Sequence, residues 1–276
     1  MAELKPYKGH YYLWQYVPNK AAAVIFLILF LLGTAAITFR MFQTRTWFTC
    51  VFVIGGLFEI IGYGARAGAH DKTERMMPYV IQNTYILLAP ALFAATIYMC
   101  LGRIIRQVQG ESRSIVPVRW LTLIFVSGDV ISFLVQGGAA GLMATGDNAK
   151  LGENMVVGGL MIQILVFGFF IITTIIFQSR MGKDPTALSQ DPSSEWTKHI
   201  YMLYAVSLLI MVRSVFRVAE FAMGAEGYLL KHEWTLYIFD STLMLLVVGI
   251  FYWRYPALYY QKKVMDGEAF QLRSNP

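Results

Sequence analysis

Hydrophobic residues dominate seven stretches of the chain, and short polar segments separate these stretches. A helical span needs about 20 mostly apolar residues to cross about 30 Å of hydrocarbon. Each stretch meets this length, and no soluble domain is inserted between them. The pattern therefore predicts an all-α membrane protein with a single bundle of seven transmembrane helices, at Lys20–Phe39, Thr46–Ala65, Pro78–Leu101, Arg119–Ala144, Asn154–Phe177, Lys198–Phe221 and Thr235–Tyr255.

The composition agrees with this interpretation. Hydrophobic residues make up 57% of the 276 positions and charged residues only 14%, whereas soluble domains carry about 25% charged residues. The deficit extends along the whole length, so a cleaved signal peptide does not explain it. The net charge of +6 comes mostly from the short connections, which makes it a determinant of topology and gives no support for a nucleic-acid partner.

The distribution of Lys and Arg predicts the orientation, because cytoplasmic segments carry the excess. Thirteen of them lie on the side that follows the first, third, fifth and seventh helices, and eight lie on the other side. We therefore expect an extracellular segment at 1–19, a membrane domain at 20–256 and a cytoplasmic tail at 257–276. The polar segment Met181–Glu195 is expected to form a flexible cytoplasmic loop.

Several polar and ionisable side chains fall inside the predicted spans, where a charge costs roughly 2.5–3.5 kcal/mol on insertion scales. They recur at helical spacing on one face of each helix, and most fall in the outer half of the membrane. Lipid cannot satisfy such groups, so they should face the bundle interior. The candidate ligand-binding residues are Glu59, Tyr63, Arg66, Gln82, Tyr85, Asp129, Gln136, Gln163, Arg213, Arg217, Glu220, Tyr237 and Asp240.

These residues predict a polar pocket in the extracellular half, lined by both signs of charge. We expect Arg217 to pair with Glu220 within one helix, and Arg213 to pair with Asp240 or Glu59 between helices. The alternative is that the same residues only hold the helices together, since interhelical polar contacts average about 0.6 kcal/mol in one well-studied bundle.

Small residues and one proline predict features of the packing. Gly137 and Gly141 form a G-x-x-x-G pair that is typical of tight helix contacts. The same interpretation applies to the pairs Gly55–Gly56 and Gly158–Gly159. Pro90 lies in the middle of the third span, where it should kink the helix and free a carbonyl group.

The sequence gives little support for an enzyme. The histidines His10, His70, His199 and His232 lie in tails, loops or helix ends, so we find no three ligands for a catalytic zinc ion. No P-loop is present, and the last span has no lysine for a retinal Schiff base. We predict no metal and no resident cofactor.

Several co-linear motifs resemble the fungal RTA-like family, also called lipid-translocating exporters. They are EIIGYGAR (Glu59–Arg66), QNTYILLAPALFAATIYMCLGRI (Gln82–Ile104), SGDVISFLVQGGAAGL (Ser127–Leu142), GGLMIQILVFGFF (Gly158–Phe170) and RSVFRVAEFAMGAEGYLLKHEWTLYIFD (Arg213–Asp240). The resemblance covers nearly the entire chain. It implies seven helices in the plasma membrane with the N-terminus outside, and it adds Glu233 to the residues of interest.

The resemblance also implies a function in moving lipids or lipophilic amphiphiles: a sphingoid base, a phospholipid, a sterol-like toxicant, or a haem or porphyrin as ligand. Membrane lipids and a lipophilic small molecule are then the expected partners. A lipid receptor or sensor that does not transport is the first alternative, and a membrane lipid hydrolase is the second. Oligomeric state, direction and energy coupling stay open.

Overall fold

A computed structural model describes residues 14, 16–70, 73–145, 149–190, 195–223 and 227–256. In this part of the chain, seven helical segments are long and apolar enough to cross a membrane. The elements are α1 (Lys20–Thr44), η1 (Trp47–Thr49), α2 (Cys50–Ala69), α3 (Met76–Gln107), η2 (Glu111–Arg113), α4 (Val118–Thr145), α5 (Ala149–Lys183), α6 (Trp196–Ala222), α7 (Tyr228–Lys231), α8 (Glu233–Leu236), η4 (Tyr237–Thr242) and α9 (Leu243–Trp253). The predicted tail at 257–276 lies outside the described residues.

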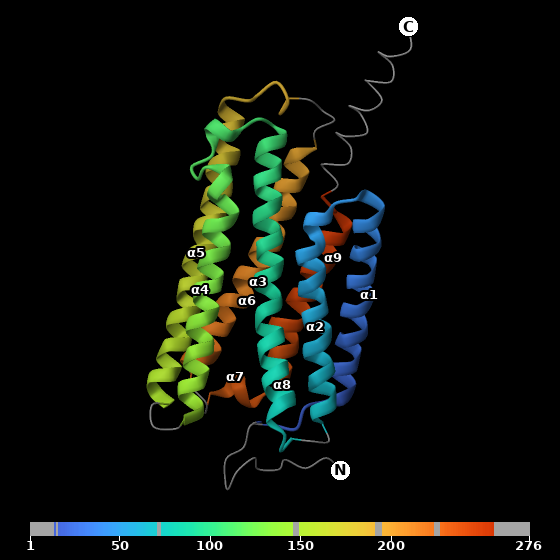
Figure 1. The fold of residues 1–276 in the computed structure, drawn as a ribbon, viewed down its shortest axis with the longest axis vertical. Helices are drawn as coiled ribbons and strands as arrows, with labels where there is room; N and C mark the ends of the chain where they lie inside the picture. Colours follow the sequence, from blue (N-terminus) through green and yellow to red (C-terminus); the bar gives the residue numbers. More distant parts are fainter. Residues whose placement is uncertain are drawn as a thin grey trace.

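The helices run up and down in one bundle, as the sequence predicts (Figure 1). α3 lies between the α4–α5 pair on one side and the α1–α2 pair on the other. Helices α6 and α9 pack behind these helices, and α6 also contacts α3 and α5. We call the end of the bundle where α1 begins the Lys20 end. The beginnings of α3 and α8 and the ends of α2 and α6 lie at that end as well.

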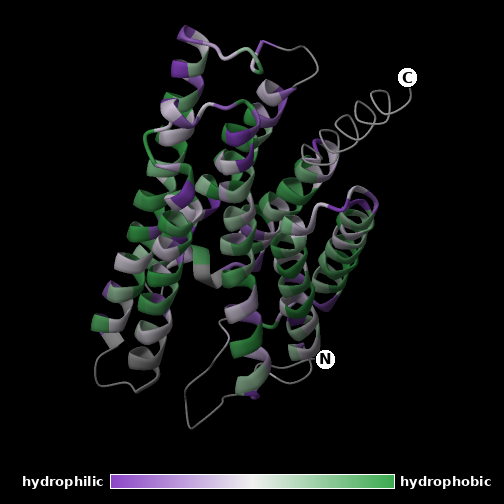
Figure 2. Cartoon of the chain, turned by 45° about the horizontal axis from the view of Figure 1, so that its top comes forward, coloured by the Kyte–Doolittle hydropathy of each residue, from purple (hydrophilic) through white to green (hydrophobic). Residues whose placement is uncertain are grey.

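Large hydrophobic side chains cover the outside of the bundle. Leu32 and Phe39 on α1 are 62% and 70% exposed, and Leu134 on α4 and Leu165 on α5 are 66% and 67% exposed. Colouring by hydropathy shows the same distribution, with hydrophobic residues along the length of the helices and hydrophilic residues concentrated at several helix ends (Figure 2). A surface of this kind is stable in lipid and would be unstable in water. The chain is therefore an integral membrane protein.

The interior holds one large core of aromatic and aliphatic side chains, to which α3 contributes the most buried face, and a smaller cluster of Ala139, Val156 and Leu160 lies between α4 and α5. The Phe52 ring stacks on Phe93 and on Phe251, with ring centroids 4.3 Å and 4.1 Å apart. Gly55 permits this stack, because a Cβ at this position would lie 2.8 Å from the Phe93 ring. Gly56 is closer still to its neighbour, since a Cβ there would lie 2.2 Å from the Thr34 Oγ1 of α1. These two glycines confirm the prediction of tight helix contacts.

The G-x-x-x-G prediction on α4 is wrong at Gly137, because a Cβ added there would meet no atom within 4 Å. The surroundings of Gly141 lie outside the described residues. Instead, α4 and α5 approach closely at Gly159, where an added Cβ would lie 2.9 Å from Gln136 and 3.1 Å from the Ser132 carbonyl oxygen. Gly158 also faces open space, so only one glycine of this pair serves the contact.

The seventh span is not the uniform α-helix that hydropathy predicts. Between α8 and α9 the chain makes a π-helical segment, η4, over Tyr237–Thr242. The Ser241 and Thr242 hydroxyls donate hydrogen bonds to the carbonyls five residues earlier, those of Leu236 and Tyr237. A wide turn of this type is rare and is found mostly as a single turn within an α-helix, often at functional sites. Asp240 lies within it.

Candidate functional site

The middle of the bundle contains a group of charged side chains that we call the central cluster: Glu59 on α2, Arg213 on α6 and Asp240 on η4. Their relative exposures are 1%, 2% and 1%. The Arg213 Nε donates to the Asp240 Oδ1 in a very short contact, which makes a buried ion pair between α6 and η4. This contact confirms one of the two pairings that the sequence left open for Arg213.

Pro90 accounts for the second contact of Arg213. Proline has no amide hydrogen, so the carbonyl four residues earlier on α3 has no partner within the helix. That carbonyl belongs to Ile86, and the Arg213 Nη2 donates to its oxygen at 3.1 Å. The freed carbonyl expected from the sequence is therefore an acceptor for the arginine of the central cluster. Through this one side chain, α3, α6 and η4 are joined.

Glu59 is the least satisfied member of the central cluster. Neither of its carboxylate oxygens has a hydrogen-bond donor among the described residues, and the Asp240 Oδ2 also has none. Glu59 lies within electrostatic reach of Asp240, Arg213 and Arg217. Most buried polar groups in native structures have at least one partner, so each exception needs an explanation. The central cluster has three such oxygens at a point closed to solvent.

Two further contacts flank the central cluster. Arg217 and Glu220 form the predicted pair within α6, with 2.7 Å between the Arg217 Nη1 and the Glu220 Oε2. The Arg217 Nε has no hydrogen-bond acceptor among the described residues. On the other side, the hydroxyls of Tyr63 and Ser241 share a short hydrogen bond between α2 and η4.

A second group, which we call the end cluster, surrounds Arg66 at the Lys20 end: Arg66, Gln82, Glu233, Tyr237 and Tyr16. Arg66 is fully buried. Its guanidinium donates to the Glu233 carboxylate at 2.6 Å, to the hydroxyls of Tyr16 and Tyr237 at 3.0 Å each, and to the Gln82 Oε1 at 3.2 Å. The fixed fork of an arginine suits several acceptors at once. The end cluster lies about 10 Å from Glu59 along α2, at 1.5 Å per residue.

The end cluster attaches the segment before α1 to the bundle. The two Glu233 carboxylate oxygens accept hydrogen bonds from the backbone amide of Asn19 at 2.8 Å and 3.0 Å. The Asn19 side-chain oxygen caps α1 by accepting hydrogen bonds from the backbone amides of Ala21 and Ala22. The Trp14 ring lies 5.8 Å from the Arg66 guanidinium. Burial raises the pKa of Tyr16, although Arg66 opposes the shift. Tyr16 therefore stays a neutral hydroxyl that can donate or accept.

Asp129 belongs to neither cluster. It lies on α4, and its Oδ2 accepts a hydrogen bond from the Tyr98 hydroxyl of α3 at 2.9 Å. Further along α4, Gln136 donates to the Ser132 hydroxyl, which donates to the Gly159 carbonyl of α5 at 2.5 Å. These contacts join α3, α4 and α5. The structure therefore divides the predicted single pocket into a central cluster, an end cluster and this separate set.

Two candidates are not brought to either cluster. Tyr85 is half-buried and packs its ring edge-on against Phe58, with the centroids 4.8 Å apart. Gln163 is half-buried on α5 and makes no side-chain hydrogen bond to a described residue. Conversely, sequence reasoning missed Tyr16, Tyr98 and Ser241. Tyr16 precedes the first span, so no helical spacing indicates its contact with Arg66. Ser241 follows Asp240 directly, and this position indicates a place near the central cluster.

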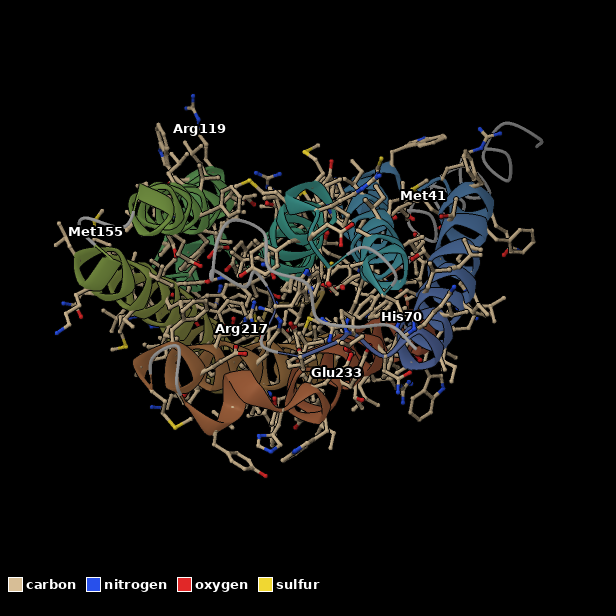
Figure 3. All side chains as sticks on the ribbon, turned by 90° about the horizontal axis from the view of Figure 1, so that it is seen from below. Met41, His70, Arg119, Met155, Arg217 and Glu233 are labelled. Carbon is tan, nitrogen blue, oxygen red and sulfur yellow. The ribbon has the colours of Figure 1, made fainter. Side chains whose placement is uncertain are left out.

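Viewed from the Lys20 end, Arg217 and Glu233 lie towards the middle of the bundle, whereas Arg119 and Met155 lie at its rim (Figure 3). Arg217 of α6 and Glu233 of α8 thus lie on the inner side of the bundle. Within the described part of the chain, no three His, Cys, Asp or Glu side chains are grouped as metal ligands would be. The arrangement offers charged and hydrogen-bonding groups of both signs, which suit recognition of a polar head group.

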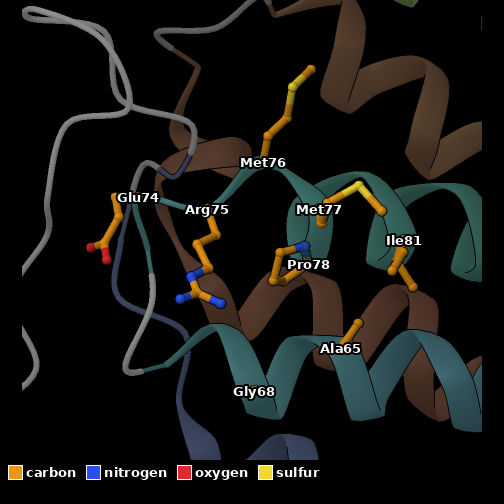
Figure 4. A pocket seen from close by; sticks show the side chains of 8 residues that line it. All are labelled: Ala65, Gly68, Glu74, Arg75, Met76, Met77, Pro78 and Ile81. Carbon is orange, nitrogen blue, oxygen red and sulfur yellow. The ribbon is translucent and has the colours of Figure 1, made fainter.

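The chain also has an open groove away from both clusters, lined by Ala65, Gly68, Glu74, Arg75, Met76, Met77, Pro78 and Ile81 (Figure 4). It lies where α2 ends and α3 begins. None of the predicted ligand-binding residues lines it, although Ala65 precedes Arg66 and Ile81 precedes Gln82 in the chain.

Comparison with known sequences identifies relatives in Saccharomyces cerevisiae. The protein named "Protoporphyrin uptake protein 1" is 35% identical over 274 aligned residues, covering 87% of this chain and 90% of the relative. "Protein RTA1" is 33% identical over 276 residues, covering 91% and 87%. "Sphingoid long-chain base transporter RSB1" is 25% identical over 265 residues, covering 83% and 69%.

Two of these relatives are named for uptake or transport rather than for catalysis. No solved structure matches the chain significantly. Residues 52–263 match the family described as "RTA1 like protein". This stretch includes both clusters except for Tyr16 of the end cluster, and the chain belongs to the RTA1-like family of membrane proteins.

Proposed function

We propose that this protein moves a lipid or a lipophilic amphiphile across the membrane and binds its polar head group at the central cluster. The observation that carries the proposal is the set of buried carboxylate oxygens without donors on Glu59 and Asp240. A substrate that supplies hydrogen-bond donors or a positive charge would satisfy these oxygens. The names of the relatives, which refer to a sphingoid base and to protoporphyrin, support a substrate with a large apolar part.

The two signs of charge suit two classes of head group. An ammonium group would pair with Glu59 and with the free oxygen of Asp240. A carboxylate group, such as a porphyrin propionate, would pair with Arg213 or with Arg217, whose Nε has no acceptor among the described residues. The remaining predicted residues near the clusters, including Tyr63 and Glu220, would orient these charges. The apolar part of the substrate would lie against the hydrophobic side chains between the helices.

Transport requires the central cluster to become accessible, because its side chains are 1–2% exposed here. Alternating access in transporters is commonly a movement of one part of the bundle against another around a fixed site. Arg213 contacts Asp240 on η4 and the Ile86 carbonyl beside Pro90. A head group that competes for Arg213 or Asp240 would weaken the joint between α3, α6 and η4. Substrate binding and opening would then be coupled.

The test is reconstitution into liposomes with two probes, a fluorescent sphingoid base and protoporphyrin. Movement and binding are measured separately for the unaltered protein and for Glu59→Gln, Asp240→Asn and Arg213→Ala. The proposal expects Glu59→Gln and Asp240→Asn to abolish movement of the amine, and Arg213→Ala to abolish movement of the carboxylate. A matched control is Asp184→Asn, which changes an exposed carboxylate paired with Arg113 at 2.7 Å.

Full transport of both probes by correctly folded Asp240→Asn and Arg213→Ala proteins would refute the role of the central cluster. Binding without movement by the unaltered protein would favour a lipid receptor or sensor. We further propose that the protein works in the plasma membrane with its N-terminus outside. Accessibility of a tag placed at either end of the chain in intact cells tests that orientation.

A further inference from the structure

The groove between the ends of α2 and α3 has a volume of about 650 Å³, within the range of about 300–1,000 Å³ that is usual for small-molecule sites. Small residues on α2 create it. Ala65 and Gly68 lie three positions apart, so they share one helix face, and a Cβ added at Gly68 would meet no atom within 4 Å. On α3, Pro78 and Ile81 form the opposite wall at the same spacing (Figure 4).

The lining is mostly apolar, with charge at one end. Apolar atoms make up most of the surface of the groove, and Met77 is 68% exposed beside it. Arg75 and Glu74 contribute the charges, but their side chains point in different directions. The Arg75 guanidinium extends towards the end of α2 that carries Gly68, and the Glu74 carboxylate points away (Figure 4). Arg75 therefore places a positive charge on the Gly68 side of the groove, although Glu74 also belongs to the lining.

Arg75 has the features of a cation that is available to a ligand. It is exposed, and it makes no hydrogen bond or ion pair with another described residue. It lies at the junction between a polar connection and a long apolar helix, the level at which lipid head groups meet hydrocarbon. Arginine binds phosphate well because its planar fork presents several donors in fixed directions.

The groove is separate from the two clusters. Arg66 follows Ala65 and Gln82 follows Ile81, and the hydrogen bond between Arg66 and Gln82 at 3.2 Å closes the inner side of the α2–α3 contact. The Arg66 side chain is fully buried, whereas Gly68 and Met77 are exposed. A ligand in the groove would thus lie on the outer wall of the bundle, in reach of the surrounding lipid.

We propose that this groove binds one anionic membrane phospholipid, with an acyl chain along Ala65, Gly68, Pro78 and Ile81 and the phosphate head group on Arg75. The proposal goes beyond the transport function, because it assigns lipid binding to a place other than the central cluster. The end of α2 and the beginning of α3 flank the groove, and these two segments also carry Arg66 and Gln82. A bound lipid would therefore hold the two helices together at the Lys20 end.

The experiment uses the full chain in nanodiscs of phosphatidylcholine. A small fraction of the lipid is phosphatidylglycerol with a photoactivatable group on one acyl chain, and peptide mass spectrometry locates the cross-links. A phosphatidylcholine with the same photoactivatable chain is the comparison lipid. We expect cross-links within Ala65–Ile81, with the anionic probe favoured.

Two variants test the two halves of the site. Gly68→Leu fills the groove without a backbone clash, and it should lower the anionic cross-link there by about tenfold, a loss of ~1.4 kcal/mol. Arg75→Gln should lower the preference for the anionic probe by about two- to fivefold, the range for an exposed ion pair. The matched control is Gly138→Leu, because Gly138 on α4 also faces open space. This variant should change neither the cross-linking yield at the groove nor the preference for the anionic probe.

The proposal is overturned if Gly68→Leu and Gly138→Leu give the same cross-linking yield at Ala65–Ile81, or if the two probes label this segment equally. Glu59→Gln separates this result from the transport proposal. That variant should keep the groove cross-links, because Glu59 does not line the groove. Loss of transport in Glu59→Gln together with unchanged labelling in Gly68→Leu would sustain the central cluster and reject the groove.

Discussion

The two buried arginines Arg66 and Arg213 lie in clusters that differ in how fully their polar groups are paired. Arg66 donates to four side chains, and its main carboxylate partner, Glu233, has further donors of its own. Arg213 has one carboxylate and one backbone carbonyl, and the neighbouring Glu59 has no donor. Fully satisfied buried networks make a structure rigid. The difference suggests a fixed end cluster and a central cluster with capacity for a ligand.

The largest change in stability is expected from Arg66→Ala. Removal of one partner from a buried ion pair leaves an uncompensated charge, so we expect the free energy of unfolding to fall by at least about 3 kcal/mol. Thermal unfolding in detergent measures this loss. Arg106→Ala is the control, since Arg106 pairs with Glu111 at 3.8 Å with both side chains at least 60% exposed. Equal melting temperatures for the two variants would contradict a structural role for the end cluster.

Asp240→Asn should have a smaller effect on stability and a larger effect on transport. Asparagine still offers an oxygen to Arg213 but lacks the charge, and a hydrogen bond to a charged group contributes about 1.5–3 kcal/mol. We expect a loss in that range and no transport of an amine probe. Denaturation and liposome assays on the same preparation measure both. Retained transport with lowered stability would make Asp240 a structural residue like those around Arg66.

Tyr16→Phe tests how the segment before α1 is held. The substitution removes one of the four hydrogen bonds of Arg66, and a single hydrogen bond contributes about 1 kcal/mol. Hydrogen exchange near Asn19 should increase while transport stays unchanged. Tyr201→Phe, at a tyrosine that is 61% exposed, serves as the control. A transport defect in Tyr16→Phe would show that the end cluster takes part in the transport cycle.

Glu59→Gln should change stability least, because no donor among the described residues loses its acceptor. Movement of the amine probe should nevertheless be abolished. A stable protein without transport would give the sharpest contrast with Arg66→Ala. A strongly destabilised Glu59→Gln protein would instead indicate that this carboxylate holds the bundle together.

The seven spans were predictable because the cost of exposing polar groups to lipid leaves a strong signal in the sequence. Their ends were less predictable. Helix α3 runs over Met76–Gln107 and α5 over Ala149–Lys183, well beyond the apolar stretches at Pro78–Leu101 and Asn154–Phe177. Hydropathy detects only the part of a helix that lies in hydrocarbon. Hydrogen bonding continues into the polar flanks, where hydropathy gives no signal.

The candidate site was predictable in its members and less so in its grouping. Helical spacing indicated that Arg213, Asp240 and Glu59 share the interior, and Pro90 indicated a free carbonyl on α3. The contacts of Tyr16 and Asn19 with Arg66 and Glu233 were not predictable, because Tyr16 and Asn19 precede the first span and carry no helical periodicity. The placing of Asp129 beside Tyr98 depends on which helices are neighbours, and that information is not contained in the pattern of a single helix.

The π turn at Tyr237–Thr242 also has a consequence for chain length. A hydrogen bond to the fifth residue in place of the fourth accommodates one more residue per turn, so this segment is geometrically equivalent to an α-helix with a one-residue insertion. Successive residues of an α-helix differ by about 100° in direction. Deletion of one residue here would therefore rotate α9 by about 100° relative to α8, and Tyr237 and Ser241 could no longer face Arg66 and Tyr63 together. The length of this short segment therefore determines the directions in which its side chains face the two clusters.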